Sequence, residues 1–159
     1  MIVLATRKNC KGDCVRFESW LPVFGDQTYR GDCPTESNEQ VTLFARMRKR
    51  WPDTIGRVAI HPRNEGKRTP GQVWHQKAEG MTTGAPDVIV PGAPALIVEM
   101  KRRDHTASTW QKGQVEYLKA AHDMGAFVCV ALGADAAIEA IECYLRITTK
   151  TTPSGSKTS

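Results

Sequence analysis

Two short apolar segments joined by a turn, within residues 84–104, constrain the fold more than any other part of the chain. The segments DVIV and ALIVEM are rich in β-branched residues and the sequence PGAP between them is a turn signal, so the pattern predicts a β-hairpin. A turn centred on Ala93 places Asp87 directly opposite Glu99, with Cβ atoms about 5 Å apart. Lys101 lies two residues beyond Glu99 and therefore shares its face of the strand. A shift of the turn by one residue would remove this opposition.

The three charges at the open end of the hairpin predict a site for a cation. Two carboxylates at this separation repel one another unless a proton or a cation lies between them. Oxygen ligands favour a hard divalent ion, Mg²⁺ or Mn²⁺, over zinc. Lys101 beside such an ion would orient or help to deprotonate an attacking water, or stabilise phosphate charge in a transition state. The alternative is a salt-bridged strand end with a solvated charge run at 101–104, and the charge spacing alone favours that alternative.

The segments around the hairpin predict a mixed α/β fold. An early helix begins after its N-cap Thr35, and its apolar stripe consists of Gln40, Leu43, Phe44, Met47 and Trp51. The other expected elements, in chain order, are a short strand at 56–62, a basic loop, a short amphipathic segment at 73–80, the hairpin, a helix at 108–123 closed by Gly125, a strand at 126–132 and a helix at 134–145.

Polar side chains interrupt the apolar faces of two predicted helices. A step of 100° per residue places Glu36 on the stripe of the first helix and Glu39 at its margin. Gln114 lies on the stripe of the helix at 108–123. Each of these side chains costs about 1 to 3 kcal/mol if it is buried without a partner. Together with the charges of the hairpin, such coincident departures from pattern indicate a functional site.

Basic residues concentrate in one part of the chain. The net charge is +5, and between Arg46 and Lys77 there are nine Lys/Arg residues against two acids, Asp53 and Glu65. This excess favours a polyanion partner, because phosphate neutralisation releases counterions; the alternative is a solvated helix face followed by an exposed loop. No apolar run approaches the roughly 18 residues of a membrane span, and the first residues lack the layout of a secretory signal, so we expect a cytosolic protein with no membrane partner.

The length of 159 residues predicts one domain with extended ends. We expect a cysteine-bearing N-terminal extension at 1–34, a folded domain at 35–147 and a disordered tail at 148–159. Three of the five cysteines, Cys10, Cys14 and Cys33, lie in the extension. Tetrahedral zinc takes four ligands and no fourth is evident, so we expect reduced cysteines, with a structural zinc site on these three as the alternative.

The order of these motifs resembles the VRR-NUC branch of the PD-(D/E)xK nuclease superfamily, in its stand-alone, bacteriophage-encoded form. The resemblance covers roughly residues 35–145. It depends on a Gly-x-Pro-Asp shape at 84–87, a Glu-x-Lys at 99–101, a Gln-led helix that ends at a glycine, and an apolar strand with an Ala-rich closing helix. It implies a restriction-endonuclease-like α/β core, with a mixed central β-sheet flanked by helices, that hydrolyses DNA phosphodiester bonds with Mg²⁺ or Mn²⁺.

The resemblance also implies the metal ligands. Carried over by matching position, Asp87 and Glu99 would hold the ion, together with the backbone carbonyl of Met100. The acid from the first helix would be Glu36. Glu39 lies close by in the sequence, but the position of Glu36 on the apolar stripe favours Glu36.

The remaining roles follow from the same resemblance. Lys101 would be the catalytic lysine that orients water, and Gln114 a supporting catalytic group or a contact to the DNA backbone. The basic loop and its surroundings would bind DNA phosphates without reading base sequence. The expected DNA-binding residues are His61, Arg63, Asn64, Lys67, Arg68 and Arg102.

The function that the resemblance implies is a Mg²⁺- or Mn²⁺-dependent endonuclease specific for DNA structure, acting on Holliday junctions, flaps or other branches. The expected location is the cytoplasm of a bacterial or phage-infected cell, and a homodimer is one expected working form. Two alternatives stay open. One is a non-catalytic nucleic-acid-binding or assembly module on the same fold, and the other is a sequence-specific restriction-type nuclease.

Overall fold

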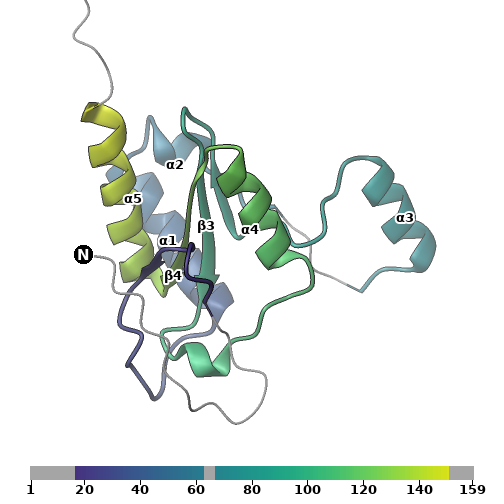
Figure 1. The fold of residues 1–159 in the computed structure, drawn as a ribbon, viewed down its shortest axis with the longest axis horizontal. Coiled ribbons are helices and arrows are strands. Elements are labelled where there is room, and N and C mark those ends of the chain that lie inside the picture. The colour runs from purple at the N-terminus through teal and green to yellow at the C-terminus, as the bar shows by residue number, and fades with distance from the viewer. Residues whose placement is uncertain (1–16, 63–66, 151–159) are drawn as a thin grey trace, which may run out of the picture.

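A four-stranded mixed β-sheet with helices on both faces forms the centre of the protein (Figure 1). The computed structural model describes residues 17–62 and 67–150. This architecture confirms the predicted mixed α/β fold. In chain order the elements are β1 (Val23–Phe24), α1 (Glu36–Arg50), α2 (Ile55–Val58), α3 (Pro70–Ala78), β2 (Val88–Val90), β3 (Leu96–Lys101), the 3₁₀ turn η1 (His105–Ala107), α4 (Gln114–Asp123), β4 (Phe127–Leu132) and α5 (Ala134–Lys150).

The hairpin has the register that the sequence predicts. Strands β2 and β3 pair antiparallel with Val90 opposite Leu96, so the turn is centred on Ala93. Strand β4 lies parallel to β3 on its other side, and β1 lies parallel to β4, which gives the strand order β1-β4-β3-β2. Continued by one more pair beyond β2, this register brings Asp87 opposite Glu99.

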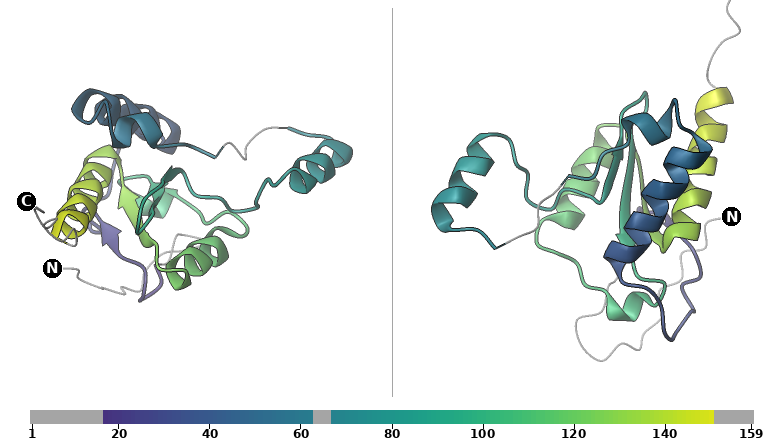
Figure 2. Two further views of the ribbon diagram at one scale, coloured as in Figure 1. Left: turned by 90° about the horizontal axis from the view of Figure 1, so that it is seen from above. Right: turned by 180° about the vertical axis from the view of Figure 1, so that it is seen from behind.

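The two faces of the sheet bury different clusters, because successive strand residues point to opposite sides. Helices α1 and α5 cover one face, where Leu43 shares a cluster with Val98 (Figure 2). Helix α4 covers the other face, where Leu118 shares a cluster with Ile97. Glu99 lies two residues after Ile97 and therefore points to the α4 face.

Helix α3 extends away from this core, as Figures 1 and 2 show. None of its residues is buried, and it makes no extensive contact with another helix or strand of the described chain. Local interactions stabilise it instead: Thr69 and Gln72 form a capping box, and Pro70 occupies the first helical position. The amphipathic segment predicted at 73–80 is therefore part of a helix that stands free of the sheet.

The prediction of a strand at 56–62 is wrong. Helix α2 begins this segment, and Ile60 pairs with the sheet through one isolated bridge to Ile89. The close packing of Gly56 on the end of α1 explains the difference, because a Cβ on Gly56 would lie only 2.5 Å from the carbonyl oxygen of Met47. The chain thus folds back tightly against the end of α1 before it reaches the sheet.

Helix α4 begins at Gln114, later than the predicted start at Ser108. Gly113, directly before it, has a left-handed backbone with φ of +85°. A Cβ on Gly84 would lie 2.1 Å from the carbonyl carbon of Gly113, so two glycine backbones pack directly on each other here. This contact between distant segments holds 108–113 as a loop, in which the side chain of Ser108 is buried.

Residues 17–34, predicted as part of an extension, belong to the folded unit. Strand β1 joins the sheet beside β4, and Leu21 is fully buried in the cluster under α4. At the other end, α5 continues through Lys150, past the predicted boundary at 147, and residues 151–159 lie outside the described part of the chain. No described helix is long and apolar enough to cross a membrane.

Candidate active site

Asp87 lies at the open end of the hairpin, one residue before β2. Its Oδ2 accepts a hydrogen bond from the Met100 backbone N–H at 2.8 Å, which holds the carboxylate beside strand β3. Its backbone carbonyl accepts bonds from Nδ1 of the His61 ring at 2.8 Å and from Nε2 of Gln40 at 3.4 Å. These contacts fix the backbone and the side chain of Asp87 next to Glu99.

Lys101 is almost completely buried, and its ammonium group uses all three of its N–H donors within the protein. They donate to Glu99 Oε1 at 2.8 Å, to Gln114 Oε1 at 3.1 Å and to the Thr109 carbonyl at 3.2 Å. The ammonium nitrogen also lies 4.8 Å from the centre of the Trp110 ring. The lysine predicted to be catalytic is therefore held rigidly on the α4 face, in contact with Glu99.

Glu99 keeps one buried oxygen, Oε2, for which the described residues offer no hydrogen-bond partner. Burial and then the neighbouring carboxylate of Asp87 raise the pKa of Glu99 to about 8, although Lys101 acts in the opposite direction. Burial likewise raises the pKa of Asp87. An unsatisfied buried acceptor beside a second carboxylate is an unfavourable arrangement that a proton or a cation would relieve.

The raised pKa of Glu99 predicts that the metal-free protein loses stability as the pH rises from about 4.5 to about 8. In this window the folded state binds a proton that the unfolded state has released, so the free energy of unfolding falls with pH, by roughly 5 kcal/mol in all. Glu99→Gln removes the titrating group and should flatten the decline in urea unfolding curves measured with chelator. Glu116→Gln, at an exposed position of α4, is the matched control. An equally steep decline in Glu99→Gln would contradict the assignment.

Gln114 is buried at the first position of α4 and links the helix to the lysine. Its Oε1 accepts from Lys101 and from the backbone N–H of Gln111, at 3.1 and 2.8 Å. Gln114 could be predicted from the sequence, but the carbonyl of Thr109 and the ring of Trp110, which complete the surroundings of the lysine, could not. Trp110 has the spacing of an apolar helix residue, which does not predict a contact with a charged group, and backbone carbonyls leave no trace in a sequence.

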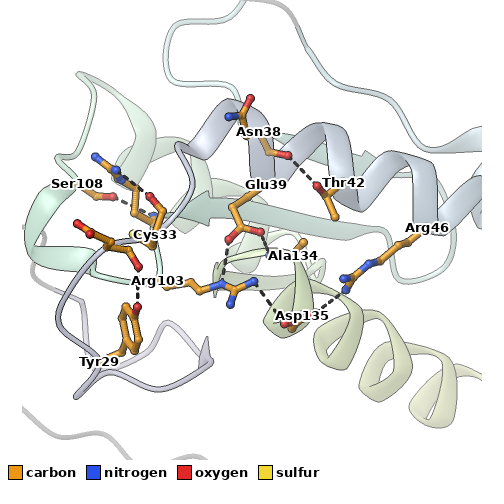
Figure 3. A network of polar contacts seen from close by, with 12 residues as sticks. Tyr29, Cys33, Asn38, Glu39, Thr42, Arg46, Arg103, Ser108, Ala134 and Asp135 are labelled. Atoms are coloured by element: carbon orange, nitrogen blue, oxygen red, sulfur yellow. Dashed lines mark hydrogen bonds and ion pairs between the residues drawn. The ribbon is translucent and has the colours of Figure 1, made fainter.

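Glu39 has a structural role that its position in the sequence does not predict. It is 2% exposed and lies with Leu43 and Met47 on the buried face of α1, so its expected place at the margin of the stripe is wrong. Its Oε1 accepts from Arg103 Nε at 2.9 Å, and its Oε2 accepts from the backbone N–H of Ala134 at 2.9 Å (Figure 3). Glu39 therefore caps the N-terminus of α5.

Glu36, in contrast, lies near the two carboxylates. It is half-buried and accepts a hydrogen bond from Ser108 Oγ, which in turn accepts from the backbone N–H of Arg102 at 3.0 Å. Its negative charge is also among the causes, after burial and other contributions, that raise the pKa values of Asp87 and Glu99. The structure thus places Glu36 near the carboxylate pair, whereas the carboxylate of Glu39 caps helix α5.

The predicted DNA-binding residues are spread over several segments. His61 is exposed at the start of the α3 arm, the segment 61–84 that carries α3, and Lys67 is exposed before the helix. Arg68 is half-buried and contacts the sulfur of Met81 at 3.2 Å. Arg102 is half-buried and donates to the carbonyl of Cys33 at 3.1 Å. Arg63 and Asn64 lie outside the described residues.

Two of the three cysteines of the alternative zinc site, Cys10 and Cys14, lie outside the described residues. Cys33 is half-buried and free. Within 17–62 and 67–150, no group of three or more His, Cys, Asp or Glu side chains is arranged to hold a metal ion. The candidate active site is therefore a pair of carboxylates, Asp87 and Glu99, with Glu36 nearby.

A comparison with solved structures finds a protein of the same architecture. The chain is similar to a VRR_NUC domain protein, with a TM-score of 0.56 and 21% sequence identity, over 73% of this chain and 92% of that one. The two proteins share a fold. This likeness supports the mixed α/β core that the order of motifs predicts. No protein-family model matches the chain, and neither does the sequence of any curated protein.

Proposed function

We propose that this chain is a metal-dependent endonuclease that hydrolyses phosphodiester bonds in DNA, with a preference for branched structures. The observation that carries the proposal is the unsatisfied Oε2 of Glu99, buried beside Asp87 while Lys101 holds the other oxygen. The fold shared with a VRR_NUC domain protein supports a nuclease. The local basic excess supports a nucleic-acid substrate.

The donor set fits a hard divalent ion. Asp87 and Glu99 offer carboxylate oxygens, and burial raises the pKa values of both. We propose that they hold Mg²⁺ or Mn²⁺ with the carbonyl of Met100, and that Glu36 supports the site. When bound, such an ion would supply positive charge that activates water and stabilises phosphate oxygens.

Lys101 orients the site more than it transfers protons. Because Glu99, Gln114 and a backbone carbonyl occupy its three N–H donors, it can reach a water or a phosphate only by giving up one of these bonds. The bond to Thr109 is the longest of the three and is the one to exchange. In the hydrolysis a water oxygen attacks phosphorus in line with the leaving oxygen, the water loses a proton, and the leaving oxygen gains one. Lys101 would keep Glu99 turned so that Oε2 faces the ion.

A substrate panel tests the proposal. Purified protein is incubated with linear, flap, fork and four-way-junction DNA, with Mg²⁺, with Mn²⁺ and with chelator. We expect cleavage with either ion, none with chelator, and faster cleavage of branched DNA than of linear duplex. Binding without cleavage on every substrate would favour the non-catalytic module. Cuts confined to one short sequence in linear duplex would favour a restriction-type enzyme.

A further inference from the structure

Helix α3 presents a tryptophan to solvent. Trp74 is 72% exposed and has no hydrogen-bond or ring partner among the described residues. Tryptophan side chains usually bury most of their large apolar surface, so this exposure is unusual. The helix does not depend on Trp74 for its own stability, since its capping box is local and none of its residues is buried.

The face of α3 around Trp74 is open. Gly71 and Lys77 lie three residues before and three residues after Trp74, so they share its face of the helix. A Cβ on Gly71 would meet nothing within 4 Å, and the backbone there does not have a positive φ. Neither packing nor backbone geometry therefore requires a glycine at this position, where alanine would favour the helix. Gly71 therefore adds no side chain to the face of α3 that carries Trp74.

The arm that carries α3 is positively charged. Within residues 67–83 the basic residues are Lys67, Arg68 and Lys77, against the single acid Glu79. Glu79 lies 3.7 Å from the His75 ring, whereas Lys67 and Lys77 are exposed and have no acidic partner in the described chain. Exposed lysines on the same arm as an exposed aromatic ring complement a chain of stacked bases and phosphates.

Both ends of the arm lie at the candidate active site. At its start, the ring of His61 bonds the backbone carbonyl of Asp87 at 2.8 Å. At its end, Gly84 packs on Gly113, directly before Gln114. Gly84 is also only three residues from Asp87, or about 10 Å of extended chain. A DNA strand with a phosphate at the carboxylates therefore passes the base of this arm.

We propose that α3 is a stacking platform for an unpaired nucleobase of the substrate, with Trp74 receiving the base and Lys67 and Lys77 contacting phosphates. The inference rests on the proposed nuclease function and deepens it, because it assigns the recognition of single-stranded segments in branched DNA to a specific helix. In duplex DNA the bases are stacked on one another, so their faces are not open to an indole ring. An unpaired base in a flap or at a junction exposes its face and can stack on Trp74.

A second copy of this chain fits the arm less well than DNA does. Each copy carries a net charge of +5, and the face around Trp74 is itself basic, so two such surfaces repel. Nucleic acid offers both the planar partner for the ring and the negative charge for the lysines.

The test measures binding rather than cleavage, with chelator present, by fluorescence anisotropy. The probes are a single-stranded oligonucleotide, its duplex, and the duplex with a single-stranded flap. We expect Trp74→Ala to weaken binding of the single strand and the flap about 5- to 100-fold while duplex binding is unchanged, and Trp74→Phe to restore most of the loss. Met124→Ala removes another exposed apolar side chain (89% exposed) and should change nothing. A double Lys67→Gln, Lys77→Gln variant should lower the salt slope for the single strand by about 1.4.

The outcomes separate this inference from the proposed function. Equal single-strand affinities for Trp74→Ala and the unsubstituted protein would overturn the platform even if cleavage occurs. Loss of affinity for duplex and single strand alike, or conversion of a dimer to a monomer by Trp74→Ala in size-exclusion chromatography, would also overturn it. Single-strand binding that depends on Trp74 in a protein that cleaves no DNA would support the platform and reject the nuclease. Absence of any DNA binding would reject both.

Discussion

Asp87→Asn should reduce DNA cleavage by about a hundred- to a thousandfold while DNA binding in chelator stays within about twofold of the unsubstituted protein. The asparagine keeps an oxygen that can accept from the Met100 N–H, so the local fold is preserved. What it removes is one of the two negative charges proposed to hold the cation. The measurement is the single-turnover cleavage rate on the best substrate of the panel, alongside binding of the same DNA.

A matched control comes from the same chain. Asp135 is an exposed acid that pairs with Arg103 and Arg46 away from the hairpin, so Asp135→Asn should keep its cleavage rate within about twofold, as surface pairs contribute little (Figure 3). Full cleavage by Asp87→Asn would exclude a role for this carboxylate in the chemistry. Loss of both binding and cleavage would point to a folding defect, which circular dichroism would detect.

Glu39→Ala and Glu36→Ala should have opposite effects, although the two acids are only three residues apart. Glu39→Ala leaves the buried N–H of Ala134 without an acceptor and removes the partner of Arg103, so we expect the free energy of unfolding to fall by about 2 to 3 kcal/mol. Glu36→Ala loses one bond to Ser108 at a half-buried site and should cost about 1 kcal/mol or less. Glu36→Ala should instead slow cleavage at least about tenfold, a smaller effect than the hundredfold or more of a general acid or base, because Glu36 supports the site rather than holding the ion alone.

Urea unfolding and cleavage rates, both measured well below the melting temperature, separate the two roles. Glu39→Gln is a useful companion, because its amide oxygen can still accept from one of the two donors and should recover part of the lost stability. A stable but inactive Glu39→Ala, together with a fully active Glu36→Ala, would reverse the assignment of the helix acid.

The hairpin was the part of the site that the sequence could predict. The turn residues determine where the chain reverses, and the turn centre determines which residues are opposed, so the proximity of Asp87 to Glu99 needed only local information. Gln114 could be predicted for a related reason, because an amide on an apolar helix face has to find a hydrogen-bond partner inside the protein. That partner is Lys101.

The predictions from sequence that are wrong concern residues whose local conformation is determined by distant segments of the chain. Glu39 is buried because the start of α5, Ala134, needs an acceptor, and that residue is 95 positions away. The segment at 108–113 has the apolar spacing of a helix, but Gly113 packs on Gly84 and the helix begins only afterwards. Strand β1 is two residues long and depends on β4 for all of its pairing, so its own sequence shows no periodicity.

The packing of Gly84 on Gly113 changes the meaning of the Gly-x-Pro-Asp sequence. The aspartate is proposed to act through its charge, but the glycine meets a spatial demand, since even a methyl group there would overlap the neighbouring backbone. Any larger residue would push away the segment that leads into Gln114, and with it one of the three acceptors around Lys101. Position 84 should therefore tolerate substitution as poorly as the carboxylates, although it contributes no chemical group at all.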